Sequence, residues 1–485
     1  MNTECNQDCF PFHSLNPFHS LNHREIRADF NGGRITSDGG GLLLREVEKK
    51  TGIIRQFSRC FIDHRDPELI EHSVAELVAQ RVYGLALGYE DLNDHDGLRY
   101  DSLLALLVEK PDLTGEERRR PRDQGAALAG KSTLNRMELG APKMKERERY
   151  KKVILDDAAV DRMLVDNFIQ AQGEAPQEIV LDLDSTDIPL HGEQEERFFH
   201  GYYGHYCYLP LYIVCGEYVL CARLRPSNID GAKDSVPEVE RIVEQIRQAW
   251  PEVRIILRGD SGFCRDELLA WCETHGVDYV VGLAKNARLL RQIEAESAQA
   301  AEQYQQTGKA ARVFTEFVYR TQDSWSRARR VIAKAEHLDK GANPRFVVTS
   351  LSSQEAVFPA SSRWVAQALY EQFYCARGDM ENRIKEQMML FADRTSTSWL
   401  RSNQIRLYFS TVAYLLMQGL RRLGLAGTEL AQAQCNTIRL KLLKIGAAVR
   451  VTVRKVWIAW SAAYPYIELF RRVHRQLQQA VPQRC

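Results

Sequence analysis

Apolar side chains in the middle of this chain occur in short runs that end in acidic residues. The first run, Ile179 to Leu183, is followed within a few positions by further carboxylates. A short apolar run bounded by polar turn residues predicts a buried β-strand. Side chains two apart on a strand point to the same side, so two of these carboxylates share one face. The acids at this strand end are Asp182, Asp184 and Asp187.

A second apolar run ends in the same way. Val253 to Leu257 leads into Arg258-Gly-Asp260-Ser-Gly-Phe263, where the glycines allow a sharp turn and a close approach to a charged ligand. Ligands in open α/β sheets bind beyond the carboxyl ends of the strands. We therefore predict that the two acidic strand ends meet at one edge of a sheet.

A late segment, residues 370–386, has helical periodicity. One stripe along it is polar, because residues three or four apart lie on the same helix face. Its members are Tyr374, Arg377, Glu381 and Lys385. The neighbouring stripe is apolar and predicts the face that packs on the sheet. Its members are Phe373, Met380, Ile384 and Phe391.

Taken together, these motifs resemble a known family. Asp184 in D-S-T, Asp260 in R-G-D-S-G-F and Glu381 in Y-x2-R-x3-E are similar to the signature of DDE transposases from bacterial insertion sequences. The resemblance is to the insertion-sequence 1380 family, which is allied to the Tyr-Arg-Glu-Lys signature group. It extends from about Phe30 to the C-terminal region. The signature Lys position is Met388 here, and Lys385, one turn earlier, is the candidate replacement.

The resemblance implies a chemistry. Asp184, Asp260 and Glu381 are expected to be the catalytic residues that hold two Mg²⁺ ions, for which Mn²⁺ can substitute, because hard oxygen ligands suit these ions. Asp182 stays a rival to Asp184. Water would cut DNA at the element's ends, and the freed 3′-hydroxyl would attack target DNA. The stripe residues other than Glu381 are expected to contact the DNA backbone.

The expected fold class is α/β, with a ribonuclease-H-like core, a β-rich insertion, and helical domains on both sides. The pattern of three strands, a helix, and then alternating strand and helix over residues 176–285 agrees with the resemblance. The expected divisions are a disordered tail 1–24, a helical DNA-binding domain 25–175, the core 176–285, an insertion subdomain 286–358, the catalytic helix segment 359–394 and a basic helical domain 395–485.

Within the N-terminal helical domain, two motifs have competing interpretations. Residues 127–139 are a candidate helix-turn-helix element, in which Lys131 and Arg136 can reach DNA; a solvated helix face is an equal alternative. Residues 125–132 also match the P-loop pattern. A P-loop needs a buried strand before its first glycine, and the preceding residues 116–124 are strongly charged. We therefore expect no nucleotide cofactor.

Charge is unevenly distributed along the chain. Residues 395–485 carry a net charge of +12, whereas residues 1–394 carry −11. A basic segment on an acidic body predicts a polyanionic partner, here double-stranded DNA. The alternative is a basic face that only meets solvent. The cations concerned are Arg439, Lys441, Lys444, Arg450, Arg454 and Lys455.

The insertion, residues 286–358, contains Trp325, which is either a base-stacking side chain or, more commonly for Trp, a packed one. Eleven scattered cysteines without a C-x2-C pair favour reduced thiols and a cytoplasmic, nucleoid-associated protein without a membrane segment. The expected working form is a homodimer that holds two DNA ends. Two other functions stay open: a Mg²⁺-dependent structure-selective DNA nuclease of the same fold, and a non-catalytic DNA-binding regulator.

Overall fold

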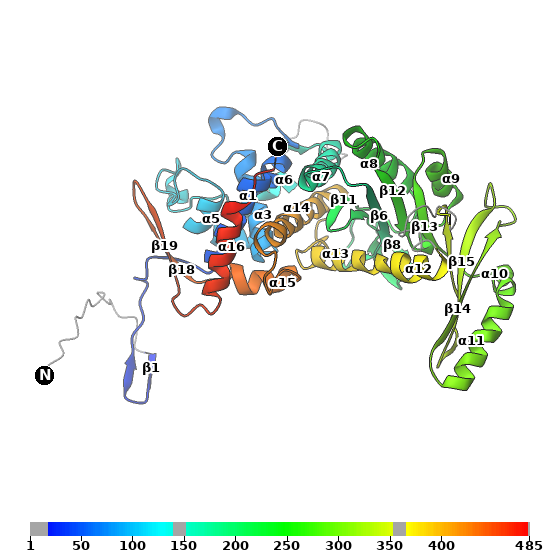
Figure 1. Ribbon diagram of the computed structural model, residues 1–485. Helices are drawn as coiled ribbons and strands as arrows, with labels where there is room; N and C mark the ends of the chain where they lie inside the picture. The colour runs from blue at the N-terminus through cyan, green and yellow to red at the C-terminus, as the bar shows by residue number, and fades with distance from the viewer. Residues whose placement is uncertain (1–17, 139–151, 353–364, 484–485) are drawn as a thin grey trace.

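The computed structural model describes residues 18–138, 152–352 and 365–483. Most of the expected tail, the end of the 127–139 candidate helix and the boundary between the insertion and the catalytic helix lie outside these ranges. Figure 1 shows an elongated molecule with a large β-sheet in one half and a helical body in the other. The helix that carries Glu381 runs between them.

The large sheet has nine strands. Their bounds are β6 Glu178–Ser185, β10 Leu211–Cys215, β11 Tyr218–Arg223, β12 Arg254–Gly259, β13 Asp278–Leu283, β14 Ala311–Tyr319, β15 Arg329–Leu338, β16 Gly341–Ala342 and β17 Arg345–Thr349. The strand order is β11-β10-β6-β12-β13-β17-β15-β14, with β16 paired to β15. Strands β6, β12 and β13 are mutually parallel, and β10 is antiparallel to β6.

The central strands are apolar on both faces because both faces are covered. On β12, Ile255 and Leu257 belong to the main hydrophobic core. Ile256 points the other way and packs in a second cluster with Leu369 and Tyr370. Burial on both faces explains why this strand reads as a continuous apolar run and not as an alternating one.

Helices cover the sheet from two sides. Figure 1 shows α8 (Ser235–Ala249) and α9 (Asp266–Thr274) on one side, and α12 (Ala366–Ala368) and α13 (Gly378–Met388) on the other. Both helices fall within the strand-and-helix pattern that the sequence predicts for this region. The α9 side therefore closes the sheet from one face, while the α13 side brings Glu381 to the other.

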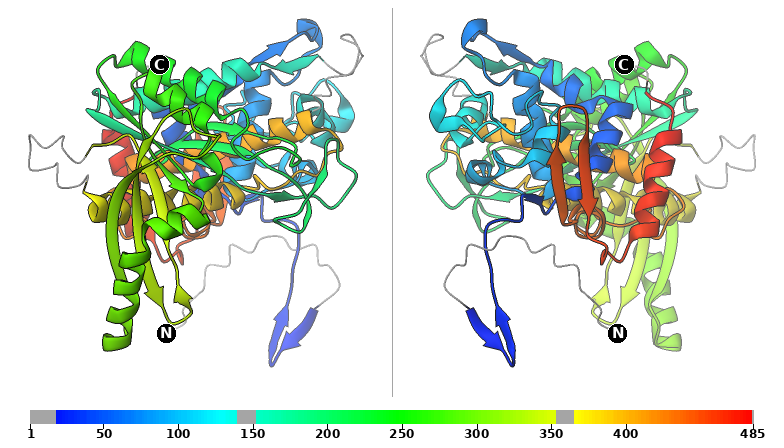
Figure 2. Two further views of the ribbon diagram at one scale, coloured as in Figure 1. Left: turned by 90° about the vertical axis from the view of Figure 1, so that its right-hand side faces the viewer. Right: turned by 90° about the vertical axis from the view of Figure 1, so that its left-hand side faces the viewer.

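The insertion extends the main sheet and does not form a sheet of its own. Strand β17 pairs antiparallel with β13, and β15 and β14 follow. Helices α10 (Ala287–Gln292) and α11 (Glu294–Thr307) precede these strands, and α11 packs on β14 and β15. Figure 2 shows this arm projecting from the molecule. Pairing with β13 satisfies the backbone groups that an open sheet edge would leave exposed.

Segments from both ends of the chain share the helical body. Its longest helix, α14 (Leu400–Gly424), is buried along most of its length and packs against α1 and α3. Within the described ranges, no helix is long and apolar enough to cross a membrane. The other helices are α1 Leu42–Thr51, α2 Ile53–Ser58, α3 Val74–Leu87, α4 His95–Leu98, α5 Ser102–Leu107, α6 Lys131–Glu138, α7 Asp157–Gln172, α15 Cys435–Ile438 and α16 Ile467–Gln479.

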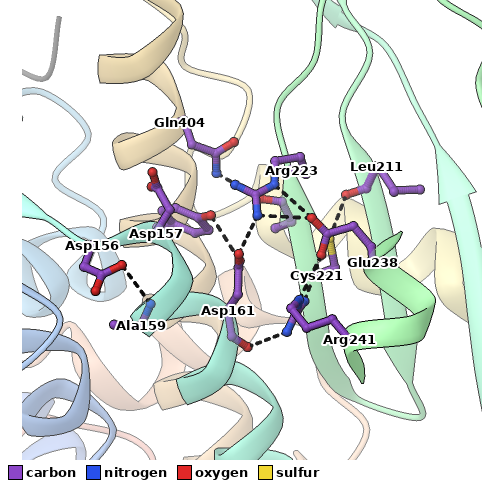
Figure 3. A network of polar contacts seen from close by, with 12 residues as sticks. Asp156, Asp157, Ala159, Asp161, Leu211, Cys221, Arg223, Glu238, Arg241 and Gln404 are labelled. Atoms are coloured by element: carbon purple, nitrogen blue, oxygen red, sulfur yellow. Dashed lines mark hydrogen bonds and ion pairs between the residues drawn. The ribbon is translucent and has the colours of Figure 1, made fainter. Parts of the chain in front are cut away.

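A charged network joins this body to the sheet (Figure 3). Asp161 on α7 accepts a 2.5 Å hydrogen bond from Arg223 on β11, and Arg223 also contacts Glu238 on α8 at 3.1 Å. Tyr408 on α14 donates to the other oxygen of Asp161 at 3.2 Å. Asp161 and Arg223 together thus connect four elements: α7, β11, α8 and α14.

Short strands complete the fold, and two of them differ from the expectation of an all-helical C-terminal domain. Strands β18 and β19 form a hairpin that pairs with the N-terminal strand β3. Part of the expected tail, residues 18–24, lies in a second hairpin, β1–β2. The short strands are β1 Phe18–Leu21, β2 Arg24–Ile26, β3 Arg34–Thr36, β4 Phe61–Asp63, β5 Val153–Leu155, β7 Ile188–Pro189, β8 Phe198–His200, β9 His205–Tyr208, β18 Ala447–Val451 and β19 Val456–Trp460.

Candidate active site

Asp184 and Asp260 lie at neighbouring strand ends. In the parallel pairing of β6 with β12, Leu183 is opposite Gly259, so the next residue on each strand is an aspartate. Neighbouring strands are about 5 Å apart, which puts the two carboxylates side by side. The Asp184 side chain accepts from the Ser185 backbone N–H at 3.0 Å. The Asp260 side chain accepts from the Gly262 N–H at 2.8 Å and so caps the turn that follows β12.

Glu381 reaches this sheet edge from α13. Arg377, one turn earlier, links it to the strand: its Nη1 lies 3.3 Å from Asp184 Oδ2, and its Nη2 lies 3.8 Å from Glu381 Oε1. The Arg377 and Asp184 side chains are largely buried, while that of Glu381 is 52% exposed. Two of the three predicted acids therefore share one arginine, and the third lies on the adjacent strand.

The pKa of Asp184 reflects both its burial and the charges around it. Burial raises the pKa of Asp184 from 3.8 to about 6, and the negative charges of Asp260 and Glu381 act in the same direction. Arg377 opposes the shift because its positive charge favours the carboxylate. Buried carboxylates close to one another resist ionisation because their negative charges repel. A bound cation would relieve this repulsion, so a raised carboxyl pKa is typical of a cation-binding site.

Tyr374 lies against the end of a third strand. A Cβ built on Gly282, in β13, would stand 2.6 Å from the Tyr374 hydroxyl and 2.8 Å from the backbone nitrogen of Ser261. Only glycine leaves room there for the tyrosine. Sequence analysis does not single out Gly282, because a lone glycine in a strand has several structural explanations.

Asp182 has a different role from its neighbour. It is buried and forms two hydrogen bonds with Arg258, at 2.5 and 2.8 Å. Arg258 also donates to the backbone carbonyl of Phe373, which precedes Tyr374 on the helical segment. This buried pair ties β6 to β12 and to the helical segment that carries Arg377. Asp182 is therefore paired within the fold, whereas Asp184 contacts Arg377 at the sheet edge.

The predicted helical stripe is irregular at its start. Residues Leu369–Tyr374 form a π-helical segment and Cys375–Arg377 a 3-10 turn, before α13 becomes regular. Extra residues of this kind often occur at functional sites, where they rotate side chains relative to a regular helix. Lys385 is exposed on α13, and Met388, at the signature Lys position, packs half-buried against the core.

Buried contacts hold α13 against the helical body. Glu386 is ion-paired with Arg421 of α14 and accepts from the Cys435 backbone N–H at 3.1 Å. Gln387 accepts from the Thr411 hydroxyl at 2.9 Å. These side chains follow Glu381 on the opposite face of the same helix. They fix the helix so that Glu381 stays near the sheet edge.

The donor chemistry of the site fits a hard divalent cation. Asp184, Asp260 and Glu381 offer carboxylate oxygens, the ligand type that Mg²⁺ prefers. In the conformation described, no three His, Cys, Asp or Glu side chains in the described ranges come close enough to hold one ion together. Arg377 lies between two of the acids and neutralises them instead. Its buried Nη1 has no hydrogen-bond acceptor within the described part of the chain.

The structure separates Lys131 and Arg136 from the carboxylates. Both are exposed on α6, which packs on α3, α14 and β5 in the helical body. The Lys131 ammonium is 3.2 Å from Asp96. The connection between α5 and α6 spans residues 108–130, far longer than the short turn of a helix-turn-helix, so α6 is not the second helix of such a motif.

Two other sequence alternatives are now decided. The P-loop pattern at residues 125–132 follows a 3-10 turn, Pro121–Asp123, and not a strand, so the match lacks its structural context. Trp325 is 4% exposed and packs edge-on against Tyr319, with the Arg329 guanidinium 5.3 Å from its ring. It is a core side chain and is not available to stack on a base.

Comparisons with known proteins identify the family of this chain. The family described as "Transposase DDE domain group 1" matches residues 18–482. Among solved structures, the chain is similar to that described as "Cryo-EM structure of piggyBac transposase synaptic complex with hairpin DNA (SNHP)", at 10% identity and a TM-score of 0.39, covering 92% of this chain and 82% of that one. No curated protein matches. The match over nearly the whole chain shows that this protein belongs to the DDE domain group 1 family of transposases and is a DDE-type transposase.

Proposed function

We propose that this transposase binds the terminal inverted repeats of its own insertion sequence, cleaves the ends and joins the 3′-hydroxyls to target DNA. The observation that carries the proposal is that Asp184 and Asp260 follow neighbouring parallel strands, while Arg377 contacts both Asp184 and Glu381. Burial, with a smaller effect of the Asp260 and Glu381 charges, raises the pKa of Asp184 to about 6. The strand order β11-β10-β6-β12-β13 supports a ribonuclease-H-like core. In it, β10 is antiparallel to both of its neighbours, and β6, β12 and β13 are parallel to one another. Within the family, we place the chain in the insertion-sequence 1380 group.

The proposed catalytic residues are Asp184, Asp260 and Glu381, which would hold two Mg²⁺ ions. Two metal ions bound in one site activate the attacking oxygen and stabilise the leaving oxygen of a phosphodiester. Glu381 has the freedom to complete this site because it is half-exposed at the surface of α13. Asp184 and Asp260 are fixed by the sheet and by their backbone hydrogen bonds.

Arg377 has two proposed states. Without metal it neutralises Asp184 and Glu381. If Mg²⁺ were bound by those carboxylates, the Arg377 guanidinium would be free to bind phosphate oxygens, for which its planar fork is suited. Its Nη1 lies 3.3 Å from Asp184 Oδ2 without a well-aligned hydrogen bond, which supports this second use. Tyr374 would position the DNA backbone, and exposed Lys385 would add a phosphate contact in place of the signature Lys.

Lys131 and Arg136 remain proposed DNA contacts on the helical body, since both lie on the exposed face of α6. The proposed partner is double-stranded DNA, at the element ends and at the target. The proposed working form is a homodimer, because the reaction must hold two ends together. Its proposed location is the bacterial nucleoid.

A strand-transfer assay tests the function. Purified protein is incubated with Mg²⁺, labelled duplexes that carry the element's end, and a plasmid target. Joined products are expected; cleavage without joining would indicate a nuclease, and a mobility shift without cleavage would indicate a regulator. Glu381→Gln should abolish cutting and leave DNA binding nearly unchanged. The matched control is Glu371→Gln on the same helical segment, whose carboxylate pairs with Arg312 outside the site.

A further inference from the structure

The hairpin of β18 and β19 is anchored on one face and open on the other. On the packed face, Ala447 and Val449 are buried. The Trp460 indole N–H donates to the Gly39 carbonyl at 2.9 Å, and its ring packs 5.2 Å from that of Phe470. Strand β3 pairs along the other side of β18. Figure 2 shows the hairpin standing out from the helical body on this base.

The open face presents aromatic and basic side chains. Arg450 is directly opposite Trp457 across the hairpin, and both are exposed. Trp457 is 57% exposed, and the Lys455 ammonium lies 5.5 Å from its ring centroid. Nearer the base, Ala448 faces Ala459, so the surface there is flat. An exposed indole beside cations suits a partner that offers both negative charge and flat rings.

The structure divides the C-terminal cations into two groups. Arg439 is buried and donates to the backbone carbonyls of Ala86 and Met389, so it does not face DNA as the sequence suggested. Lys444 pairs with Asp38 at 2.6 Å. Residues 447–460, by contrast, contain three cations and no acid. Within the described ranges, none of these three forms an ion pair with a carboxylate: Arg450, Arg454 and Lys455.

The tip of the hairpin is short and preorganised. Val453 and Arg454 form a two-residue turn closed by the Thr452 N–H, which donates to the Lys455 carbonyl at 2.9 Å. The Thr452 hydroxyl donates to the same carbonyl at 2.8 Å, and the Lys455 N–H donates back to that hydroxyl at 3.1 Å. Val453 is fully exposed. A rigid tip loses little entropy when it binds, which favours a role as an inserted element.

We propose that the β18–β19 hairpin is a duplex-DNA-binding ribbon that enters a groove of the element's end. The major groove, about 12 Å wide, admits a two-stranded ribbon. Arg450, Arg454 and Lys455 contact phosphates and base edges, while Trp457 packs on the sugar-phosphate wall. This inference rests on the proposed function, since it names a DNA contact of the same enzyme outside the carboxylate site.

The position of the ribbon says which DNA it contacts. In Figure 1, β18 and β19 are at one end of the molecule, β14 and β15 at the other, and α13 lies between them. DNA that passes the carboxylates therefore reaches the ribbon only on one side of the cut. The ribbon is therefore proposed to bind DNA on that one side, away from the cleavage point. A second protein chain pairing with the edge strand β19 is the competing occupant, which Lys455 on that edge opposes.

The test removes the ribbon's charge from the full-length protein. The variant combines Arg450→Gln, Arg454→Gln and Lys455→Gln, and the probe is a labelled duplex of the element's end titrated over a range of salt. Each lost phosphate contact reduces the slope of log affinity against log salt by about 0.9, so a reduction of about 2 to 3 is expected. The control removes three exposed cations from the distant arm: Arg291→Gln, Lys309→Gln and Lys340→Gln.

Two further measurements complete the test. In hydroxyl-radical footprinting, the ribbon variant should lose protection of the DNA on one side of the cleavage point and keep protection at the cleavage point itself. Replacing Val453-Arg454 by Asn-Gly keeps a two-residue hairpin turn and should also weaken binding. An unchanged salt slope, an equal loss in the control, or a change of oligomeric state without DNA would overturn the ribbon. Such results leave cutting by the wild type intact, whereas absence of cutting and joining by the wild type would refute the proposed function.

Discussion

Arg377 contacts Asp184 at 3.3 Å and so occupies the position from which a cation would bind this carboxylate. Replacing Arg377 by Ala should strengthen metal binding and weaken DNA cutting, because the same guanidinium competes with cations and is proposed to bind phosphate. We expect Mn²⁺ to bind about 3- to 10-fold more tightly, equivalent to about 0.7–1.4 kcal/mol for one partly exposed ion pair. Calorimetric titration of the DNA-free protein measures this.

The matched control for that experiment is Arg383→Ala. Arg383 is on the same helix but pairs with Glu217 and Glu386 on the other face. Its removal should leave Mn²⁺ affinity unchanged. Equal or weaker Mn²⁺ binding by the Arg377 variant would show that Arg377 supports the metal site and does not compete with it.

Ionised Asp184 should lower the free energy of unfolding of the metal-free protein at neutral pH. Its pKa is about 6 in the folded protein against 3.8 ordinarily, so the folded state binds the proton more tightly than the unfolded state. The contribution of Asp184 to the free energy of unfolding is then greatest below about pH 4 and is lost as the pH rises to about 6. Asp184→Asn should raise the free energy of unfolding at pH 8 by about 1–3 kcal/mol, with little effect at pH 4. Urea unfolding in chelator measures both; equal effects at the two pH values would contradict it.

Substitution of Asp182 should lower the free energy of unfolding, in contrast to substitution of Asp184. Asp182→Asn leaves Arg258 buried without its carboxylate, and breaking such a pair costs about 3–5 kcal/mol. The free energy of unfolding should therefore fall, and cutting should be lost through misplacement of the segment that begins near Phe373. Asp184→Asn is the comparison, since it should lose cutting without losing stability. A stable, inactive Asp182 variant would restore Asp182 as the metal ligand.

Trp325 should matter for folding and not for DNA. Trp325→Ala removes a buried ring that contacts Tyr319 and should lower the free energy of unfolding by about 3–5 kcal/mol. Cutting per folded molecule, measured at low temperature, should stay close to that of the wild type. A normally stable variant with defective cutting would instead make this indole a DNA contact.

Local patterns were sufficient to find the acidic strand ends and the polar stripe. Asp184 and Asp260 follow apolar runs, and the spacing of Arg377 and Glu381 is helical, so each signal lies within a few residues. The sequence alone could not separate Asp182 from Asp184, because both point from one face of one strand. Only the contact between Asp182 and Arg258, 76 positions away, distinguishes them.

The C-terminal segment shows the same limit. Its excess of positive charge is visible in the sequence, but the pairing of β18 with β3 joins residues more than 400 positions apart and could not be inferred from local periodicity. That pairing exposes Arg450 and Lys455, while the packing of α3 and α13 buries Arg439.

The sequence by itself determined the central strands of the large sheet, the helices that cover it and the identity of the candidate carboxylates, because these depend on side-chain period and on neighbours along the chain. Tertiary structure alone decided which carboxylates meet, which cations are free and where the insertion pairs. Those outcomes depend on burial and on charges brought together by distant segments, as when burial, together with the charges of Asp260 and Glu381, raises the pKa of Asp184.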